Sequence, residues 1–407
     1  MAELRLRLFD VRESYDLLQR ARPLIAEGSR RRGVLYALLD NCLMCECLKT
    51  TPSMFGVEIS PGNAAAKTLG DFGRLMAETN YNCSKILYLT GAESLIDFSN
   101  DDQLPTFAQN LAQSNQSNEV GNLSLAYLIR VFLLRMQEPL EDLFVVVGAD
   151  CCKLLLELQV VTAVRDGYQL LSVEEAIQTA TAATEESFAK VKCFSNVRLW
   201  PLEKMIIATD AQTWPYGNGI ERFEPVMYLS DDSLALLDAK PDVEGLHLLD
   251  MCCGSGVQGI SALARNAASV TFSDMNPRAL QFVRFNLAIN SLLRESCEFC
   301  LGDAYSALES EGSQKFDGIL ANPPFLPNPD GIASQAIALY GNGGAFGEDV
   351  LSSIVAGCSQ WLVDGGWVLM VTYAPNVEQM PSRLQECRGR TWNSQCQTGG
   401  SWNMLES

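Results

Sequence analysis

Asn322 opens a short turn, Asn-Pro-Pro-Phe, whose residue types suit the recognition of a flat NH2 group. Two consecutive prolines fix φ and donate no hydrogen bond, so the turn is stiff. The Asn322 side-chain oxygen and the carbonyl of Pro323 are two neighbouring acceptors, and Phe325 offers a flat apolar wall. This arrangement suits a planar primary amide or an exocyclic amine, such as those of glutamine and adenine. For these four residues alone, a rigid loop without a ligand is the alternative.

Three further predicted strand ends carry residues that suit a nucleoside-like ligand. Gly254 and Gly256 form a Gly-x-Gly between a strand and a helix, where the backbone can approach a ligand closely. Asp274 lies 24 residues after Asp250 and ends the next strand, in the position of a carboxylate that binds ribose hydroxyls. Asp303 ends a third strand and can accept a hydrogen bond from an adenine amino group. Each alone is more often a cap or turn residue, but four consecutive strand ends form a specific constellation.

Strands and helices alternate regularly in the part of the chain that carries these residues. The apolar runs predict strands at 205–209, 246–251, 269–273, 297–301, 318–321 and 367–373. Helical patterns follow at 228–237, after 256, and at 277–290 and 348–362. The alternation predicts an α/β fold with a doubly wound, mostly parallel sheet. A stiff turn at the carboxyl end of such a sheet lies where α/β proteins bind ligands.

The part that precedes the sheet is mainly helical. Helical spacing is found at 11–27, 33–49, 65–79, 122–137 and 149–158, and the polar stretch 99–121 is expected to be a loop. Two apolar runs flank Asp166-Gly167, which is a hairpin signal, so the region resembles a winged-helix-like module. We therefore expect a helical extension and linker at 1–62, a helical, winged-helix-like domain at 63–195, the α/β domain at 196–380 and an irregular tail at 381–407.

The chain is acidic, with a formal net charge of −19. From residue 201 onward there are 24 acidic and 11 basic residues. Such a surface repels phosphate backbones, and no basic patch is visible, which disfavours bare nucleic acid as a partner. Between 120 and 175 there are eight acidic and four basic residues, so we interpret the wing as a packing or protein-docking element.

Cysteine and histidine usage limits the chemistry. The fourteen cysteines are scattered, and the two Cys-x-x-Cys pairs, Cys42/Cys45 and Cys297/Cys300, lie far apart, so no metal site is expected. His247 is the only histidine and is expected in the core, which disfavours a Ser-His-Asp or Cys-His hydrolase and excludes a multi-histidine metal centre within one chain. Reduced thiols indicate a cytosol-like compartment, so we expect a cytoplasmic protein and leave organellar targeting open. No run of about 18 apolar residues predicts a membrane span.

Together these motifs resemble the class I S-adenosylmethionine-dependent methyltransferases with an Asn-Pro-Pro-aromatic turn. The resemblance covers roughly residues 205–375 and is greatest to the glutamine N5-methyltransferases that modify translation termination factors. Leu248–Gly256 matches that family's Leu-Asp-Leu-Cys-Thr-Gly-Ser-Gly, including Cys252, where other branches carry Gly. Ala338–Gly344, followed by Phe346-Gly347, resembles the family's Ala-Leu-x-Gly-Gly-x-x-Gly.

The resemblance implies S-adenosylmethionine as the cofactor and a role for each matching residue. The methionine end would be lined by Asp250, Cys252, Gly254 and Gly256, the ribose would be bound by Asp274, and the adenine by Asp303. Asn322 and Pro323 would hold the target nitrogen, with Phe325 stacked beside it. Two acceptors would orient the NH2 hydrogens and leave the nitrogen lone pair facing the sulfonium methyl, so positioning replaces a strong base.

The function we expect is methylation of a planar nitrogen, with a protein glutamine, as in a translation termination factor, as the leading acceptor. An adenine or guanine amino group in RNA or DNA is the alternative, since the same turn serves both. A third hypothesis is a degenerate cofactor-binding scaffold. It arises because residues 381–407 show no convincing strand, whereas the family adds two strands there. We therefore expect the last strands of the sheet to be missing and strand 367–373 to be an open edge.

Overall fold

The computed structural model describes most of the chain after residue 55. The described residues are 56–100, 103–116, 123–165, 169–182, 191–210, 225–308, 315–328, 339–372, 393–397 and 402–406. They form two compact units, which divide between Phe223 and Glu224, and residues 288–291 belong to the first unit. The helices expected at 11–27 and 33–49, and the Cys42/Cys45 pair, lie outside the described residues.

The first unit is mainly helical, as predicted. Its helices are α4 (Ala64–Glu78), α5 (Cys83–Thr90), η2 (Leu95–Ser99), α6 (Leu104–Gln116), α7 (Leu123–Leu128), the π-helical turn η3 (Ile129–Leu133), α8 (Leu140–Val147), α9 (Ala149–Glu157) and α10 (Val173–Ala182). Helix α6 corrects the expected loop at 99–121. Its buried side chains Leu104, Phe107 and Leu111 form a short apolar stripe at helical spacing, and packing of that stripe outweighs the polar composition.

Short antiparallel strands complete the first unit. The strands β1 (Glu138–Pro139), β4 (Val191–Ser195), β2 (Val161–Arg165) and β3 (Gln169–Leu170) form one sheet in the order β1-β4-β2-β3. The predicted hairpin is confirmed, because Val164 pairs with Leu170 and Arg165 with Gln169. A second pair, β5 (Arg198–Leu202) and β6 (Met205–Thr209), forms a separate two-stranded sheet.

The strand predicted at 205–209 therefore does not belong to the parallel sheet. Its hairpin partner β5 is fastened to the helices of the first unit, where Arg198 Nε donates to the carbonyl of Leu133 and the Tyr81 hydroxyl donates to the carbonyl of Leu199. These buried hydrogen bonds and the packing of β5 on η3 hold the hairpin there. The division between the units consequently differs from the boundary expected at 195/196.

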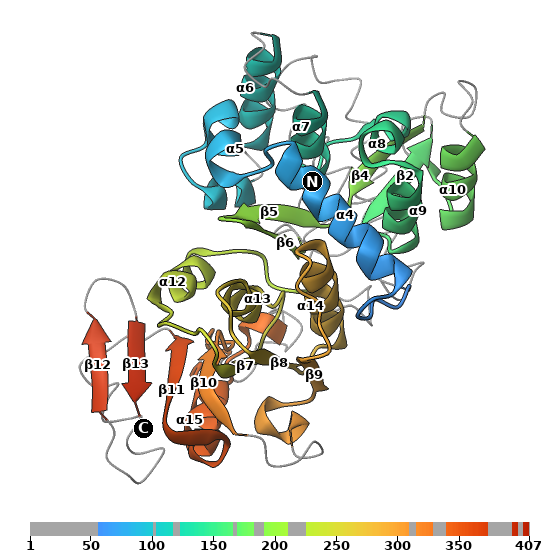
Figure 1. Ribbon diagram of the computed structural model, residues 1–407. Coiled ribbons are helices and arrows are strands. Elements are labelled where there is room, and N and C mark those ends of the chain that lie inside the picture. The colour runs from blue at the N-terminus through green and yellow to red at the C-terminus, as the bar shows by residue number, and fades with distance from the viewer. Residues whose placement is uncertain are drawn as a thin grey trace. The chain divides into compact units, whose positions relative to one another are not determined.

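The second unit is built on a seven-stranded sheet. In spatial order the strands are β12 (Asn393–Gln397), β13 (Trp402–Glu406), β11 (Leu362–Val371), β10 (Phe316–Ala321), β7 (His247–Met251), β8 (Ser269–Asp274) and β9 (Cys297–Leu301), as Figure 1 shows. The five strands from β11 to β9 are parallel. The α/β class and the doubly wound sheet are confirmed.

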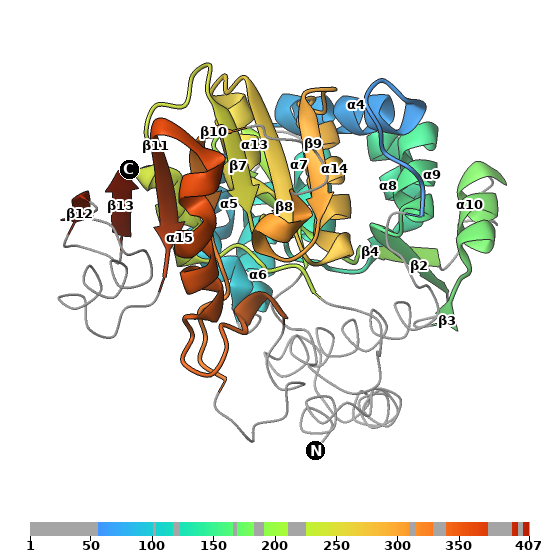
Figure 2. The ribbon, with the colours of Figure 1, turned by 90° about the horizontal axis from the view of Figure 1, so that it is seen from below.

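Helices cover both faces of this sheet. They are α12 (Asp231–Ala239), α13 (Val257–Ala264), α14 (Pro277–Ile289), the short turns η4 (Ala304–Ala307) and η6 (Leu339–Gly341), and α15 (Asp349–Trp361). The strand order runs outward from β7 to β9 and then returns to β10 and β11. Because the crossovers are right-handed, α13 and α15 lie on opposite faces, and in Figure 2 α15 lies across the near face of the sheet. The order reverses beside β7, between β8 and β10, which is where doubly wound proteins bind ligands.

The two last strands correct the expectation of an open sheet and an irregular tail. Strand β13 pairs antiparallel with β11, from Trp367↔Glu406 to Val371↔Trp402. Strand β12 pairs antiparallel with β13. Residues 393–397 read Asn-Ser-Gln-Cys-Gln, which has no apolar alternation, so the strand forms through pairing and not through a pattern of its own.

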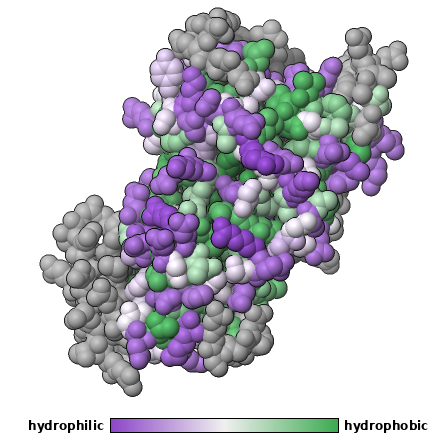
Figure 3. Space-filling model, viewed as in Figure 1, coloured by the Kyte–Doolittle hydropathy of each residue, from purple (hydrophilic) through white to green (hydrophobic). Residues whose placement is uncertain are grey.

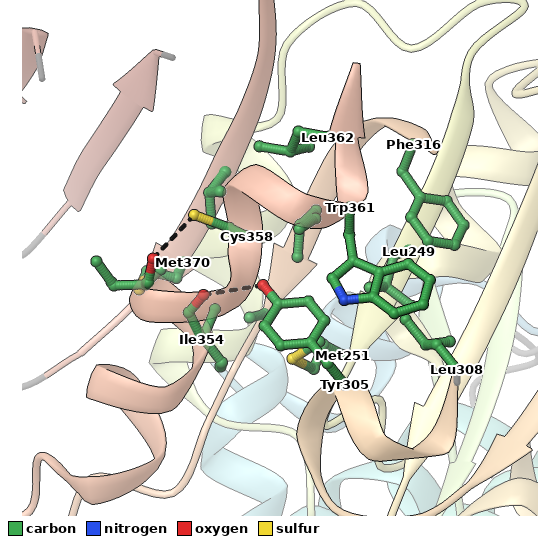
Figure 4. Close-up of a cluster of buried hydrophobic side chains, with 14 of the residues drawn as sticks. Leu249, Met251, Tyr305, Leu308, Phe316, Ile354, Cys358, Trp361, Leu362 and Met370 are labelled. Carbon is green, nitrogen blue, oxygen red and sulfur yellow. Dashed lines mark hydrogen bonds between the residues drawn. The ribbon is translucent and has the colours of Figure 1, made fainter. Parts of the chain in front are cut away.

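A buried cluster beneath α15 holds one face of the sheet together. The Tyr305 ring stacks on Trp361 at 6.1 Å with an interplanar angle of 3°, and its hydroxyl donates to the carbonyl of Ile354 over 2.9 Å (Figure 4). Leu249 and Ile319, on neighbouring strands, complete the cluster from the sheet side. Replacing Trp361 by Ala should cost about 3–5 kcal/mol of stability. This packing fixes the carboxyl ends of β7 and β10, from which the glycine turn and the Asn-Pro-Pro-Phe turn begin.

The surface is mixed. Hydrophilic and hydrophobic residues intermingle on the face drawn in Figure 3, in keeping with a mean hydropathy of +0.04. Among the described residues, no helix is both long and apolar enough to cross a membrane.

Candidate functional site

A pocket lies within the second unit at the carboxyl ends of β7, β8, β9 and β10. Six of the nine predicted site residues line it together: Asp250, Cys252, Gly254, Asp274, Asp303 and Asn322. These residues are spread over more than 70 positions of the sequence. The parallel strands bring them together because their carboxyl ends meet at one edge of the sheet. The other three, Gly256, Pro323 and Phe325, lie beside the lining residues in the chain but are not part of the wall.

The turn after β7 is unusually shaped. Cys252 has a φ of +55°, Gly254 of +51° and Gly256 of +76°. A Cβ at Gly254 would meet no protein atom within 4 Å, so this glycine keeps space open. A Cβ at Gly256 would come 2.9 Å from Val283 Cγ2, so this glycine permits the close approach of α14. Gly254 therefore keeps space open in the pocket, and Gly256 allows α14 to pack against the turn.

Sequence reasoning missed Gly259, although the spacing Gly-x-Gly-x-x-Gly over 254–259 is a recognised signal. A Cβ at Gly259 would come 2.5 Å from Phe272 Cε1, so α13 packs directly on the sheet. The Gly259 N–H donates to Asp250 Oδ2 over 2.8 Å. Gly259 thus positions both the helix and a pocket carboxylate.

Asp250 is buried, with 1% of its surface exposed. Burial raises its pKa to about 7, and the Gly259 N–H and the charge of Lys240 oppose that rise. Within the pocket, a cationic ligand would favour the ionised form of this carboxyl.

Asp274 is held by the backbone of two turns. Its Oδ2 accepts from the Gly254 N–H and its Oδ1 from the Asn276 N–H, both over 2.8 Å. Burial raises its pKa, and these backbone donors oppose the rise. Each carboxylate oxygen can accept a further hydrogen bond, so the group is fixed in place yet still able to bind hydroxyls. Asp303 differs, because its side chain is exposed at the start of η4.

Asn322 projects from the end of β10 and is half-buried. Among the described residues its side chain has no hydrogen-bond partner, although it lines the pocket. Its neighbour Pro323 is buried, Pro324 lines the pocket and Phe325 is half-buried. An amide that lines a pocket without a partner is available to a ligand.

The Asn-Pro-Pro-Phe turn is fastened by a second segment, residues 339–347, which we call the strap. The Leu326 N–H donates to the Gly341 carbonyl over 2.9 Å, and the Gly343 N–H donates to the Leu326 carbonyl over 3.0 Å. The Asn328 N–H donates to the Gly344 carbonyl over 2.8 Å. The strap therefore fixes the chain that follows the turn, as the prolines fix the turn itself.

Two aromatic residues of the wall were not singled out from the sequence. Tyr228 and Tyr340 both line the pocket, with ring centroids 6.5 Å apart in an edge-to-face arrangement. They lie 112 positions apart in the sequence, and no local pattern links them. Only the fold brings them together.

The lining is acidic. It includes three carboxyl groups, from Asp250, Asp274 and Asp303, and no Lys or Arg among its described residues. His247, expected in the core, is instead exposed, because it is the first residue of β7 at the opposite end of the strand, and its Nδ1 lies 2.8 Å from Ser269 Oγ. Within the described residues no group of three His, Cys, Asp or Glu could hold a metal ion.

The match to a family model lies within this same unit. Residues 235–352 match the model of a family described as conserved hypothetical protein 95. A release factor glutamine methyltransferase of Leptospira interrogans is 34% identical over 142 residues, which cover 33% of this chain and 49% of that protein. A provisionally named ribosomal RNA large subunit methyltransferase of Methanocaldococcus jannaschii is 29% identical over 118 residues, which cover 28% of this chain and 30% of that protein.

The chain thus spans about half or less of the length of these two relatives. A solved structure, the 16S rRNA N2 G1207 methyltransferase of T. thermophilus with AdoMet and guanosine, has 17% identity and a TM-score of 0.36, over 64% of this chain and 69% of that one. The predicted resemblance to methyltransferases is confirmed by these relatives, and the doubly wound sheet of the second unit is Rossmann-like.

Proposed function

We propose that the second unit is an S-adenosylmethionine-dependent N-methyltransferase that acts on a planar side-chain amide of a protein, with glutamine as the acceptor. The observation that carries this proposal is the place of Asn322. An amide without a partner among the described residues lines the same pocket as a glycine turn and three carboxyl groups.

The residues present fit the proposed cofactor. S-adenosylmethionine carries positive charge at its sulfonium and its ammonium. The described lining residues include three carboxyl groups and no Lys or Arg, although the charge of Lys240 also acts on Asp250. Gly254 leaves room for a ligand against the backbone, since a Cβ there would meet no protein atom. When bound, the cofactor supplies an electrophilic methyl group.

Each of the three carboxyl groups of the wall then has a role in binding. The fixed carboxylate of Asp274 would accept from ribose hydroxyls, and the exposed carboxylate of Asp303 would accept from the adenine amino group. Asp250 and the backbone from Cys252 to Gly254 would line the methionine end. Asp250 is buried and Asp274 is half-buried, which limits the access of water to these interactions.

The Asn-Pro-Pro-Phe turn would orient the acceptor. Asn322 Oδ1 and the Pro323 carbonyl would each accept one N–H of the target amide, so the nitrogen lone pair points to the methyl group. The strap holds the following residues through backbone hydrogen bonds, so the two acceptors stay in place. Phe325 would support the flat amide from one side.

An amino group of adenine or guanine in RNA is the second candidate. The ribosomal RNA methyltransferase among the relatives favours it. The acidic wall, which has no Lys or Arg among its described residues, weighs against a phosphate-rich acceptor. The hypothesis of a degenerate scaffold was based on the expected lack of the last two strands. It loses that basis, because β12 and β13 complete the sheet.

The test is methyl transfer from labelled S-adenosylmethionine into fractionated cell extract, with protease-treated and nuclease-treated controls. We expect label in the protein fraction, on glutamine side chains. Asn322→Ala should reduce transfer by orders of magnitude and leave cofactor affinity within about a factor of three, since a lost acceptor is felt mainly in the transition state. Asp274→Ala should weaken cofactor binding roughly 10–150-fold.

The two variants test acceptor binding and cofactor binding separately. Label that survives protease treatment but not nuclease treatment would identify RNA as the acceptor. Normal cofactor binding without transfer to any fraction would contradict an enzyme. Loss of cofactor binding in Asn322→Ala would show that this turn holds the cofactor and not the acceptor.

A further inference from the structure

Two large apolar side chains are exposed next to the Asn-Pro-Pro-Phe turn. Leu326 is 48% exposed and Phe346 is 81% exposed, the highest value among the exposed large hydrophobic residues described. Single exposed leucines are common, but an aromatic ring left in water beside a pocket is not explained by packing. Aromatic residues are enriched where proteins bind partners.

The backbones of the strap and of the turn are in contact beside Phe346. The strap approaches the turn so closely that a Cβ at Gly343 would lie 2.8 Å from Phe325 Cα, and a Cβ at Gly347 would lie 2.4 Å from the Phe325 carbonyl oxygen. Two backbones in contact leave no side-chain layer between them. Phe346, which precedes Gly347, therefore has no apolar layer to join on that side.

Both residues belong to segments that also line the pocket. Leu326 follows Asn322 and Pro324, and Phe346 belongs to the strap, which supplies Leu339 and Tyr340 to the wall. The two segments are tied at Leu326 by the hydrogen bonds to Gly341 and Gly343. The backbone segments that carry the two side chains are thus held next to Asn322.

We propose that Leu326 and Phe346 form a docking surface for the acceptor polypeptide and hold an apolar side chain close to the glutamine that is methylated. The proposal rests on the proposed function and deepens it, since it specifies what the acceptor must carry. The occupant is a polypeptide and not a nucleic acid, because the adjoining wall is acidic, with no described Lys or Arg, and the whole chain carries a net charge of −19. A loop with basic residues and an apolar residue beside its glutamine complements both features.

The geometry limits where that apolar residue lies. Leu326 is four positions after Asn322, so the two Cα atoms are at most about 14 Å apart. An extended acceptor covers the same distance with about four residues. An apolar side chain that contacts Leu326 should therefore lie within about four positions of the target glutamine.

Short synthetic peptides with one central glutamine and lysine at both ends provide the probe. The positions around the glutamine are varied between apolar and polar residues, and an oligoribonucleotide pool is assayed in parallel. We expect the wild-type protein to prefer peptides with Leu, Ile, Met or Phe within the stated window. Phe346→Ala and Leu326→Ala should lose this preference, with KM for the preferred peptide raised roughly tenfold and kcat changed by less than about threefold.

Two variants serve as controls. Phe346→Leu keeps an apolar side chain and should retain most of the preference. Val145→Ala removes a side chain of comparable exposure, 74%, on α8 of the first unit and should behave as the wild type. Cofactor affinity should be the same in all variants, which also shows that each is folded.

The outcomes distinguish this inference from the function on which it rests. If the wild type methylates the peptides but Phe346→Ala keeps the same preference and KM, the docking surface is wrong and the proposed function stands. If the wild type binds the cofactor but methylates no peptide, the proposed function is wrong. The docking surface, which rests on that function, is then wrong as well. Methylation of the oligoribonucleotides alone would also overturn both.

Discussion

Single residues of the pocket wall are held in conformations and charge states that cost stability. Cys252 and Ala304 are non-glycine residues with positive φ, at +55° and +45°, and both line the pocket. Asp250 is a carboxyl group with almost no exposure to water. Such features persist where the surrounding structure holds them, and they concentrate at functional sites.

Replacement of Cys252 tests the backbone strain. Cys252→Gly should be at least as stable as the wild type, by up to about 1 kcal/mol, because relief of the positive φ outweighs the added freedom of the unfolded chain. Cys252→Val should lose about 1–2 kcal/mol, since a branched Cβ fits this conformation poorly. Urea unfolding of the three proteins measures the difference, and equal stability of Gly and Val variants would contradict the strain.

The buried Asp250 predicts a pH dependence of stability without added cofactor. Its pKa is about 7 in the folded protein and near the ordinary 3.8 when unfolded, so the folded state binds the extra proton between these values. Its contribution to stability is therefore complete below pH 3.8 and is lost as the pH rises towards 7, by an amount on the order of a few kcal/mol.

Asp250→Asn should flatten this part of the stability profile, because the amide does not titrate. Glu295→Gln, at an exposed position, should leave the profile as it is in the wild type. The free energy of unfolding from denaturant titrations between pH 4 and pH 8 provides the measurement. An unchanged profile in Asp250→Asn would show that other groups cause the dependence.

At the scale of elements, the pocket depends on how closely α13 and the strap approach their neighbours. Glycines allow both approaches, Gly259 against β8 and Gly343 and Gly347 against the Asn-Pro-Pro-Phe turn. Each contact places backbone atoms where a side chain would otherwise lie. The elements are thus positioned by the absence of side chains as much as by packing.

Gly259→Ala should displace α13 from the sheet. The new Cβ would come 2.5 Å from Phe272 Cε1 and 2.9 Å from Asp250 Oδ2, atoms of side chains buried in the sheet. We expect a loss of about 1–3 kcal/mol and a weaker hydrogen bond to Asp250. The comparison is Ala264→Gly, exposed on the same helix, which should cost at most about 1 kcal/mol. Thermal unfolding of both variants measures the loss of stability. Equal losses in the two variants would show that only helix propensity matters.

At the scale of the second unit, strands β12 and β13 protect the sheet. Strand β11 carries four consecutive buried residues, Val368–Val371, and pairs with β13 on the side away from β10. Without that partner its N–H and C=O groups would form an open apolar edge.

A variant that lacks residues 393–407 should therefore associate into larger species. Size-exclusion chromatography and light scattering at micromolar concentration measure this, and a variant without Ser407 alone is the control. We expect aggregates or a lowered yield of folded protein for the longer deletion only, because it alone exposes β11. A monomeric, cooperatively unfolding deletion variant would show that β11 needs no partner.

The local sequence was sufficient to predict a site residue where that residue acts through its own backbone or through its place at the end of a strand. The strands around Asp250, Asp274, Asp303 and Asn322 are short apolar runs with turn residues after them, so they could be predicted, and parallel order then brings their ends together. The stiffness of the Asn-Pro-Pro-Phe turn also follows from its residue types alone.

Tertiary structure decided what depends on partners distant in the chain. Strand β12, polar in sequence, exists through its pairing with β13, and the hairpin β5–β6 belongs to the first unit through hydrogen bonds of Arg198 and Tyr81. The pairing of Tyr228 with Tyr340, and the exposure of Phe346 beside the pocket, have no local signature. The physical reason is the same in each case: the free energy of these arrangements lies in contacts between segments, and a local pattern records only what a segment favours by itself.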